Sequence, residues 1–479
     1  MAWETVMGLE VHVELATASK IFCGCTTKFG GEPNTHCCPI CMGMPGTLPV
    51  LNKKVLEYAL KTGLALNCEI TRYNKFDRKN YFYPDLPKAY QISQLYLPFA
   101  RDGYIDIDTD TGKKTIRIHE IHMEEDAGKL IHSDTGNETY PDYNRCGVPL
   151  IEIVTSPDFR SAKEVVAYLE KLKSVLEYLG VSDCKMQEGS LRADVNLSVR
   201  RPGEAPGIRT EMKNINSFKA IERAIDYESR RQTEVLESGG HVVQETRRWD
   251  DSQGKSFSMR SKENAQDYRY FPEPDILPIS ISEELLQKLK SELPELCDKK
   301  KARYMNDLGL SEYDADKLTQ NKALADLFEE TTRLCSHPKE VANWMLTQLL
   351  YEMNDKAAQT DNLTISPRVF AEFINIIVAG KVNKSVGKEI FTQVFLGGDN
   401  FDVNDYIIKN SLVMIDDDAA IGDVVKKVIE ANRNAVDEYG AGKTKVLSFL
   451  VGQCMRQLKG KANPETINRI MLEELKITP

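Results

Sequence analysis

The chain has 479 residues, of which 41% are hydrophobic and 28% charged, and its formal net charge is -10 at pH 7. This length predicts about two to four domains. No basic stretch precedes an apolar run at the N-terminus and no window approaches about 18 apolar residues, so we expect a cytoplasmic protein without membrane contact. The acidic balance excludes broad electrostatic capture of nucleic acid, but it leaves room for a local basic patch.

The first predicted element is a strand within VMGLEVHVEL, residues 6–15. Strict alternation places Glu10, His12 and Glu14 on one face of this strand, opposite a row of apolar side chains. The polar face therefore carries groups that can bind a metal ion. A half-exposed strand would show the same alternation, so solvated surface is the alternative.

Five of the 11 cysteines lie close together in FCGCTTKFGGEPNTHCCPIC, residues 22–41. A Cys-x-Cys pair and a Cys-x-x-Cys pair can close around a tetrahedral Zn2+ without strain. His36 or Cys37 could serve as a ligand, but Cys38 is preferred because Cys-Pro-x-Cys places two sulfurs on one turn. A fully coordinated zinc indicates a structural staple rather than a reaction centre, and buried unligated thiols are the alternative. The predicted ligands are Cys23, Cys25, Cys38 and Cys41.

Three later stretches repeat the polar alternation, namely residues 117–130 (RIHEIHMEEDAGKL), 191–200 (LRADVNLSVR) and 209–216 (RTEMKNIN). Together with the first strand, they predict an open sheet whose polar face carries Mg2+ ligands and phosphate-binding groups. Apolar residues at helical spacing predict helices over residues 161–180 and 217–240.

The proline-rich segment FPEPDILPI, residues 271–279, cannot continue a helix and marks a domain boundary. Helical periodicity dominates beyond it, and a second helical module begins near residue 412. The charge changes sign within this module: residues 401–439 carry four Lys or Arg against nine Asp or Glu, whereas residues 440–479 carry seven against three. Such a basic segment can contact RNA phosphates, although an ordinary solvated helix pair would also fit.

Long motifs along the chain resemble those of one protein family. They include GLEVHVEL, CPICMGMPGTLPVLN, RKNYFYPDLPKAYQISQ, HMEEDAGKLIH, LRADVNLSVR and GKTKVLSFLVGQCMRQLKGKANP. Over residues 3 to about 475, the sequence is similar to the B subunit of the tRNA-dependent amidotransferases. These enzymes convert Glu-tRNA(Gln) or Asp-tRNA(Asn) to the amidated product.

The resemblance implies an α+β fold in three parts. A cradle domain over residues 1–280, similar to glutamine synthetase and built on an open, mainly antiparallel sheet, would carry the ATP-dependent kinase and transamidase site. An all-α domain over residues 281–411 and a small α-helical tail over residues 412–479, which holds tRNA, would follow. The implied partners in a heterotrimer are an amidase, the A subunit, which releases ammonia from glutamine, and a small C subunit.

We expect the site residues to lie on the polar face of the sheet, together with ATP, Mg2+ and the structural Zn2+ as cofactors. Tyr81 and Tyr83 are either core aromatics or substrate contacts. The predicted Mg2+ ligands are Glu10, His12 and Glu125, the further catalytic candidates are Glu152, Asp194 and Glu211, and the candidates for phosphate contact are Lys79, Arg192 and Lys213.

Two other classes of function are compatible with parts of the sequence. A ligase of the glutamine synthetase type that acts on a free small molecule would need no basic tail. A zinc-stapled RNA-binding scaffold without catalysis would need no row of carboxylates. We therefore expect an enzyme that activates a carboxylate with ATP and joins it to ammonia.

Overall fold

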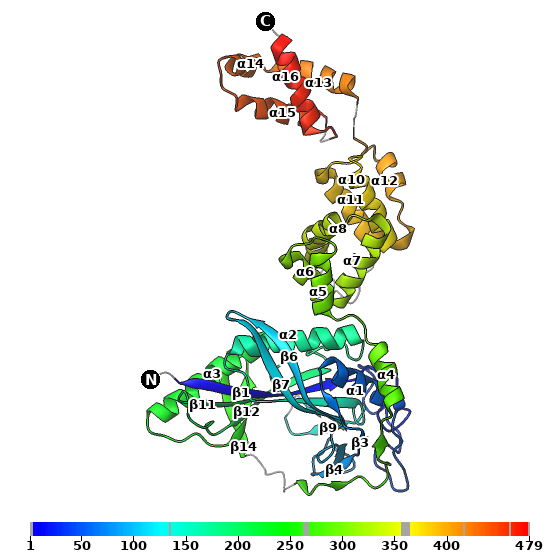
Figure 1. Cartoon of the computed structure of the whole chain (residues 1–479), viewed down its shortest axis with the longest axis vertical. Coiled ribbons are helices and arrows are strands. Elements are labelled where there is room, and N and C mark those ends of the chain that lie inside the picture. The colour runs from blue at the N-terminus through cyan, green and yellow to red at the C-terminus, as the bar shows by residue number, and fades with distance from the viewer. Residues whose placement is uncertain are drawn as a thin grey trace. The chain divides into compact units, whose positions relative to one another are not determined.

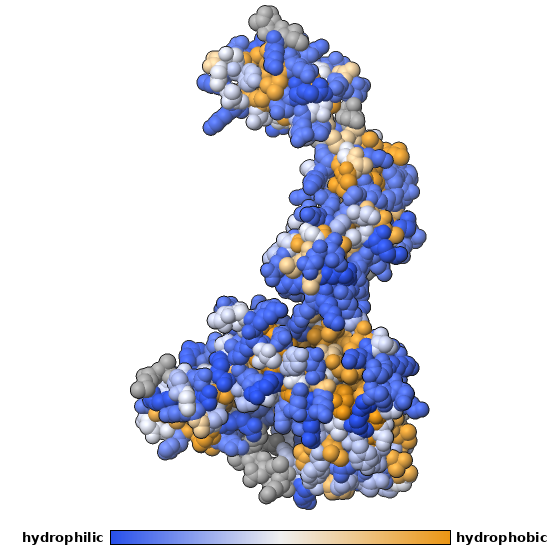
Figure 2. Space-filling model, in the orientation of Figure 1, coloured by the Kyte–Doolittle hydropathy of each residue, from blue (hydrophilic) through white to orange (hydrophobic). Residues whose placement is uncertain are grey.

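The structure is a computed structural model that describes residues 3–133, 136–261, 268–355, 365–414, 417–458 and 461–477. The chain divides into two compact units, residues 1–296 and 297–479 (Figure 1). Hydrophilic residues dominate the face seen in Figure 2, and hydrophobic residues gather there in smaller patches. None of the described helices combines the length and the apolar character that a membrane span requires.

A nine-stranded open sheet forms the centre of the first unit, and only the β12–β13 pair is parallel. Its strands, in spatial order, are β14 (Lys255–Ser261), β13 (Glu245–Asp250), β12 (Thr210–Lys213), β11 (Leu191–Arg200), β1 (Glu4–Glu14), β10 (Pro149–Thr155), β7 (Gly112–Glu125), β6 (Ala100–Thr109) and β2 (Glu69–Ile70). The predicted open, mainly antiparallel sheet is therefore confirmed.

One face of this sheet is apolar and covered by helices. The alternation in β1 buries Met7, Leu9, Val11 and Val13, because alternate side chains point to the same face. Helices α2 (Ala162–Leu179) and α3 (Phe218–Glu237) contact strands of the sheet and share this core. Both helices begin where the sequence predicts, because a serine at each N-cap accepts a hydrogen bond from a first-turn backbone N–H.

Shorter elements complete the first unit. They are α1 (Lys53–Ala65), β3 (Tyr73–Asn74), β4 (Asp77–Asn80), β5 (Tyr90–Ser93), β8 (Lys129–His132), β9 (Thr139–Asp142), β15 (Phe271–Pro272), β16 (Ile279–Ser280) and α4 (Glu283–Ser291). Helix α4 lies beyond the predicted boundary at residue 280, yet its Leu286 and Leu289 belong to the first core. Its apolar side chains, rather than the preceding prolines, decide to which unit it belongs.

The described residues of the second unit form helices and no strand, which confirms the predicted helical C-terminal region. Its first helices are α5 (Cys297–Asn306), α6 (Glu312–Thr319), α7 (Lys322–Cys335), α8 (Pro338–Trp344), α9 (Leu350–Asp355), α10 (Pro367–Val378), α11 (Lys384–Gly397) and α12 (Val403–Lys409). One apolar cluster, from Tyr304 to Ile407, packs these helices together, and a separate cluster, from Ile421 to Met471, belongs to the last four helices. These are α13 (Asp418–Ala431), α14 (Arg433–Gly440), α15 (Val446–Gln457) and α16 (Pro464–Ile477).

A buried carboxylate fixes α3 to one strand that precedes it in the chain and to one that follows it. Glu228 is fully buried and accepts hydrogen bonds from Thr210 in β12 at 2.9 Å and from Ser256 in β14 at 3.1 Å. Gln232 and Arg231, one turn along the helix, donate to the same carboxylate at 2.9 and 2.6 Å. This network holds the end of the sheet that contains β12.

We expect Glu228→Ala to lower the free energy of unfolding by about 3 kcal/mol, because it leaves buried donors and a cation without their acceptor. Urea unfolding measures the change. Glu222→Ala, at an exposed position of the same helix, is the matched control and should change stability by no more than about 0.5 kcal/mol. Equal effects of the two substitutions would contradict the role given to the Glu228 network.

Candidate active site

The polar face of the sheet borders a cavity of about 1380 Å³, lined by residues of β1, β7, β10, β11, β12 and β13. Strand register brings the predicted residues together there. In β1, Glu10 lies opposite Asp194 of β11, and His12 lies between Glu152 of β10 and Arg192 of β11. Because these pairs are cross-strand neighbours, their side chains lie close together on the polar face of the sheet, which forms the floor of the cavity.

A first group of metal-capable side chains consists of His12, Glu124 and Glu152, whose ligand atoms lie within 4.8 Å of one another. The His12 Nε2 atom is 3.6 Å from Glu124 Oε1 and 3.5 Å from Glu152 Oε2. His122 adds a second imidazole, with its Nε2 atom 2.8 Å from Glu152 Oε2. Two carboxylates and two imidazoles thus meet over three adjacent strands.

The charges in this group are strongly coupled. Burial disfavours the charged imidazole of His122, but the carboxylates of Glu152 and Glu124 raise its pKa to about 10. The pKa of His12 is raised in the same way against the effect of burial. Burial would raise the pKa of Glu152, but the two histidines hold it well below its usual range. The Glu152 carboxylate therefore stays ionised and attracts cations.

A second group consists of Glu10, Asp194 and Glu211, again within 4.8 Å of one another. The Lys213 ammonium contacts the Asp194 carboxylate and lies 3.3 Å from Glu211 Oε1. Asn196 donates a hydrogen bond to Glu10 Oε1 at 2.9 Å. Burial, together with the charges of Glu152 and Glu211, raises the pKa of Glu10, so this carboxylate takes up a proton more readily than an exposed glutamate does.

The other predicted phosphate contacts occupy the walls of the cavity. Arg192 donates to Asp126 Oδ2 at 2.6 Å. The Lys79 ammonium lies 4.9 Å from the centre of the Tyr268 ring and 5.9 Å from that of Tyr81. Tyr81 is partly buried and also lines the cavity.

Tyr83 lines the same cavity from an exposed position. Both tyrosines whose role the sequence left open therefore border the cavity.

Glu125, which the sequence suggests as a metal ligand, does not join these groups. It is buried on the other side of β7, where it pairs with Lys88 and accepts a hydrogen bond from the Ile92 backbone at 2.9 Å. Its neighbour Glu124 lies in the first group instead, because adjacent residues of a strand point to opposite faces. His122, two residues before Glu124, carries the signal that could have identified the correct glutamate.

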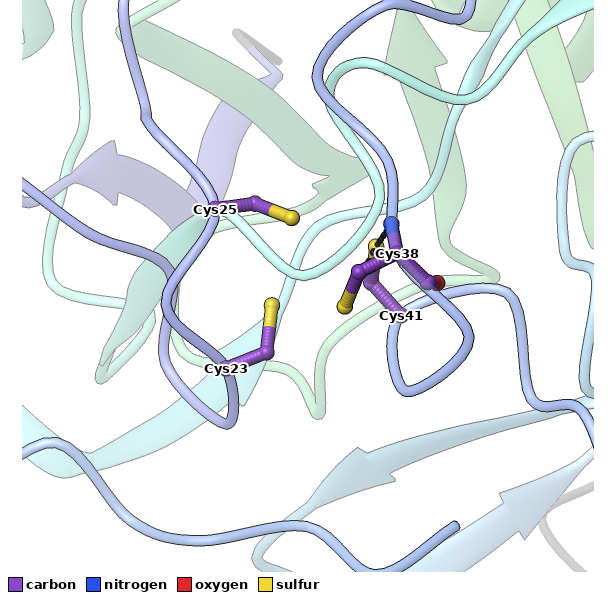
Figure 3. Close-up of side chains that lie close together, drawn as sticks. All are labelled: Cys23, Cys25, Cys38 and Cys41. Atoms are coloured by element: carbon purple, nitrogen blue, oxygen red, sulfur yellow. Dashed lines mark hydrogen bonds between the residues drawn. The ribbon is translucent and has the colours of Figure 1, made fainter.

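Four cysteine sulfurs converge from two loop segments at the predicted zinc site (Figure 3). The Sγ atoms of Cys23, Cys25, Cys38 and Cys41 lie within 4.8 Å of one another. The 3.9 Å between the sulfurs of Cys38 and Cys41 is close to the edge, about 3.8 Å, of a tetrahedron with Zn–S bonds of about 2.3 Å. Cys37 lies outside this group, with its Sγ atom 3.8 Å from Asn144 Oδ1.

The surroundings favour the thiolate at Cys41, whereas hydrogen bonding to Cys41 raises the pKa of Cys23 and burial raises the pKa of Cys25 to about 11. Hydrogen bonding from Cys23, and also from the backbone of Cys38, lowers the pKa of Cys41 to about 4. Lys20 is fully buried, and its ammonium donates to the backbone carbonyl of His36 at 2.8 Å and lies 3.7 Å from Cys41 Sγ. A buried cation beside four sulfurs suits an anionic cluster, which is the charge state that a metal ion requires.

Comparison with known proteins agrees with this geometry. The family model of the GatB/GatE catalytic domain matches residues 5–287, and that of the GatB domain matches residues 326–475. The chain is 60% identical over 474 residues to the B subunit of an aspartyl/glutamyl-tRNA(Asn/Gln) amidotransferase from Lachnoclostridium phytofermentans, with 99% of each chain covered. A protein of the same name from Agathobacter rectalis is 55% identical over 474 residues, with the same coverage.

Fold and site thus define the catalytic subunit of an amidotransferase, an enzyme that acts in a ligase-type transamidation reaction. The chain belongs to the family of aspartyl/glutamyl-tRNA(Asn/Gln) amidotransferase B subunits. The resemblance seen in the sequence motifs is confirmed.

The coupled charges predict a pH-dependent contribution of His122 to stability. Its pKa rises from the ordinary 6.5 to about 10 on folding, so the stabilisation is complete below about pH 6.5 and is lost as the pH rises through 10. The partner Glu152 has a lowered pKa, so its share is present above about pH 4.5 and lost on further acidification. The difference in unfolding free energy between wild type and His122→Gln should therefore be largest between about pH 4.5 and 6.5.

Urea unfolding of both proteins across this range, in the presence of a chelator, measures the difference. It should decline steadily between pH 6.5 and 10. A difference that stays constant up to pH 10 would show that the imidazole is not held in its charged form.

Proposed function

We propose that this chain performs the ATP-dependent amidation of misacylated tRNA, either Glu-tRNA(Gln), Asp-tRNA(Asn) or both. The observation that carries the proposal is the placement of two carboxylate groups and the Lys213 ammonium on one sheet face in a single cavity. Phosphoryl transfer depends mainly on positioning and on charge neutralisation, and this floor supplies both. The family membership supports the same reaction class.

The first group fits a Mg2+ ion by its donor chemistry. Two carboxylates and an imidazole, with ligand atoms within 4.8 Å of one another, can bind a divalent cation. His12, Glu124 and Glu152 would hold the ion, which would neutralise charge on the ATP phosphates. Glu124 thus replaces Glu125 in the ligand set that the sequence suggested.

The reaction then proceeds in two steps on the substrate. The side-chain carboxylate of the tRNA-bound amino acid attacks the γ-phosphorus of ATP, which forms an acyl phosphate and releases ADP. Lys213, Lys79 and Arg192 line the cavity as cations that can contact phosphate oxygens. Ammonia next attacks the acyl carbon, the C–O bond to phosphate breaks, and amide and inorganic phosphate leave.

Glu10 is suited to accept the proton that the attacking ammonia loses. Its pKa is raised by burial and by neighbouring carboxylates, so the protonated state costs less than for an exposed glutamate. Asp194 and Glu211 hold Lys213 beside it and complete the negative floor. Ammonia itself would come from the partner amidase, the A subunit, because this site lacks a glutamine-cleaving nucleophile in the described residues that line it.

We further propose the three-part division, with a cradle, a helical domain and a tail that holds tRNA, and a heterotrimeric complex that includes a small C subunit. The separate apolar cluster of α13 to α16 supports an independent tail module. The basic C-terminal segment favours a tRNA substrate over a free small molecule, and the carboxylate floor favours catalysis over a scaffold role.

The four-cysteine group would hold one structural Zn2+. The sulfur spacing, the low pKa of Cys41 and the buried Lys20 ammonium support this assignment. Four protein ligands leave no open position, so the ion would close the loop between the two pairs and take no part in amidation.

Elemental analysis should find about one zinc per chain. Cys38→Ser should lose the ion and lower the melting temperature, because the loop loses its cross-link. Cys37→Ser is the matched control, since its sulfur lies outside the group and the variant should keep both zinc and stability. Zinc loss in the Cys37 variant alone would reverse the ligand assignment.

Glu124→Gln keeps the size of the side chain but removes its charge, so ATP-dependent amidation should fall by about 100-fold or more. The assay uses the complex with its partner subunits and measures amidated tRNA and glutamine hydrolysis in the same preparation. Glutamine hydrolysis should persist, because the partner amidase would carry it out without any residue of this cavity.

Glu120→Gln in the same strand, at a position that does not line the cavity, should amidate like wild type. Normal amidation by the Glu124 variant would remove this carboxylate from the reaction.

A further inference from the structure

One face of helix α15 in the tail carries a basic and aromatic stripe. At about 100° per residue, positions 445, 449, 452 and 456 fall on the same side of the helix. They hold Lys445, Phe449, Gly452 and Arg456, and all four are exposed. The opposite side carries Leu450 and Cys454, which are fully buried in the core of the tail. The stripe is therefore the outer face of the helix.

Phe449 is the most unusual member of this stripe. It is 49% exposed, and among the described side chains of residues 417–458 and 461–476 it is the only large hydrophobic one with such exposure. Burying a phenylalanine stabilises a protein by about 1.5–3 kcal/mol, so an exposed one forgoes a gain that a partner could recover. An aromatic ring on a basic surface is a platform on which an unpaired base can stack.

Gly452 lies in the middle of the same helix, where glycine costs about 1 kcal/mol relative to alanine. A glycine at such a position usually makes room for a close neighbour. Here a Cβ atom would meet nothing within 4 Å, so no described part of the chain requires its absence. What the glycine does provide is bare helix backbone between Phe449 and Arg456, which a ligand can approach closely.

The charges of the stripe are available to a ligand. Lys445 and Arg456 form no ion pair with any residue that the structure describes, whereas nearby Lys443 lies 3.4 Å from Glu438. The two free cations stand about 16 Å apart along the axis, on either side of the ring. Two separate cations on either side of an aromatic ring are complementary to a nucleic-acid strand, in which bases lie between the negatively charged phosphates.

We propose that the stripe Lys445, Phe449, Gly452 and Arg456 is the surface on which the tail binds tRNA. Phe449 stacks against an unpaired base of a tRNA loop, Gly452 admits the ribose-phosphate backbone, and Lys445 and Arg456 contact phosphates on either side. This inference rests on the proposed function, because it takes tRNA as the substrate. It adds the contact surface and its mode of recognition.

The most direct experiment is Gly452→Ala in the full-length chain. Alanine should stabilise the helix and raise the melting temperature by a few degrees. It should nevertheless weaken binding of an unacylated tRNA(Gln) transcript, by about tenfold if the close approach is worth 1.4 kcal/mol. Gly422→Ala in α13 is the matched control, because its Cβ atom would also meet nothing closer than 4.0 Å. It should raise stability and leave tRNA affinity unchanged.

Two further variants separate stacking from charge. Phe449→Ala should weaken tRNA binding by about tenfold at every salt concentration, because it removes one stacked base. Arg456→Gln should weaken binding most at low salt and reduce the slope of log K against log[salt] by about 1, because it removes one phosphate contact. These variants decide the matter if Gly452→Ala proves less stable than wild type.

Wild-type affinity for tRNA in all three variants would overturn the inference. So would variants that bind tRNA normally but no longer bind a partner protein, because the stripe would then be a protein interface. If the wild-type chain itself neither binds nor amidates tRNA, the proposed function fails. If it does both and the variants bind like wild type, only the stripe is wrong.

Discussion

The pairing of strand β1 with β10 on one side and β11 on the other is the constraint on which the site depends. This register aligns His12 with Glu152 and Arg192, and Glu10 with Asp194, at the same level of the sheet. A shift of one residue would turn these side chains into the apolar core and bring Leu9, Val11 and Val13 to the cavity. The hydrophobic gain of burying the apolar row therefore also fixes the positions of the polar one.

The same arrangement concentrates negative charge in partly buried surroundings, which costs free energy unless cations compensate it. In the described structure the compensation comes from the imidazoles of His12 and His122 and from Lys213. Charges arranged in this way are ready to exchange a proton for a metal ion, because a divalent cation would replace the protonated imidazoles as partners of the carboxylates. The concentration of carboxylates on this sheet face therefore both costs folding free energy and provides the capacity to bind a metal ion.

Much of this organisation could be predicted from the sequence, because alternation in a strand reports which side chains share a face. That principle placed Glu10 and His12 together, and the Cys-Pro-x-Cys turn pointed to Cys38 rather than Cys37. It distinguishes Glu124 from Glu125 only when His122 serves as the reference, because His122 and Glu124 share one face of the strand.

The core that α4 joins could not be inferred from the sequence, for a related reason. Proline marks where a helix cannot continue, but it carries no information on which core the next helix will join. Leu286 and Leu289 settle that question through packing, which involves residues far away in the sequence. Contacts of this kind lie outside the reach of local patterns.

The most direct test of the account is a crystal structure of the chain with Mn2+ in place of Mg2+ and a non-hydrolysable ATP analogue. We predict an anomalous peak about 2 Å from ligand atoms of His12, Glu124 and Glu152, with the terminal phosphate of the analogue beside it. An ordered nucleotide elsewhere in the chain, or a peak on the Glu125 side of β7, would contradict the proposal that the polar face of this sheet is the phosphoryl-transfer site.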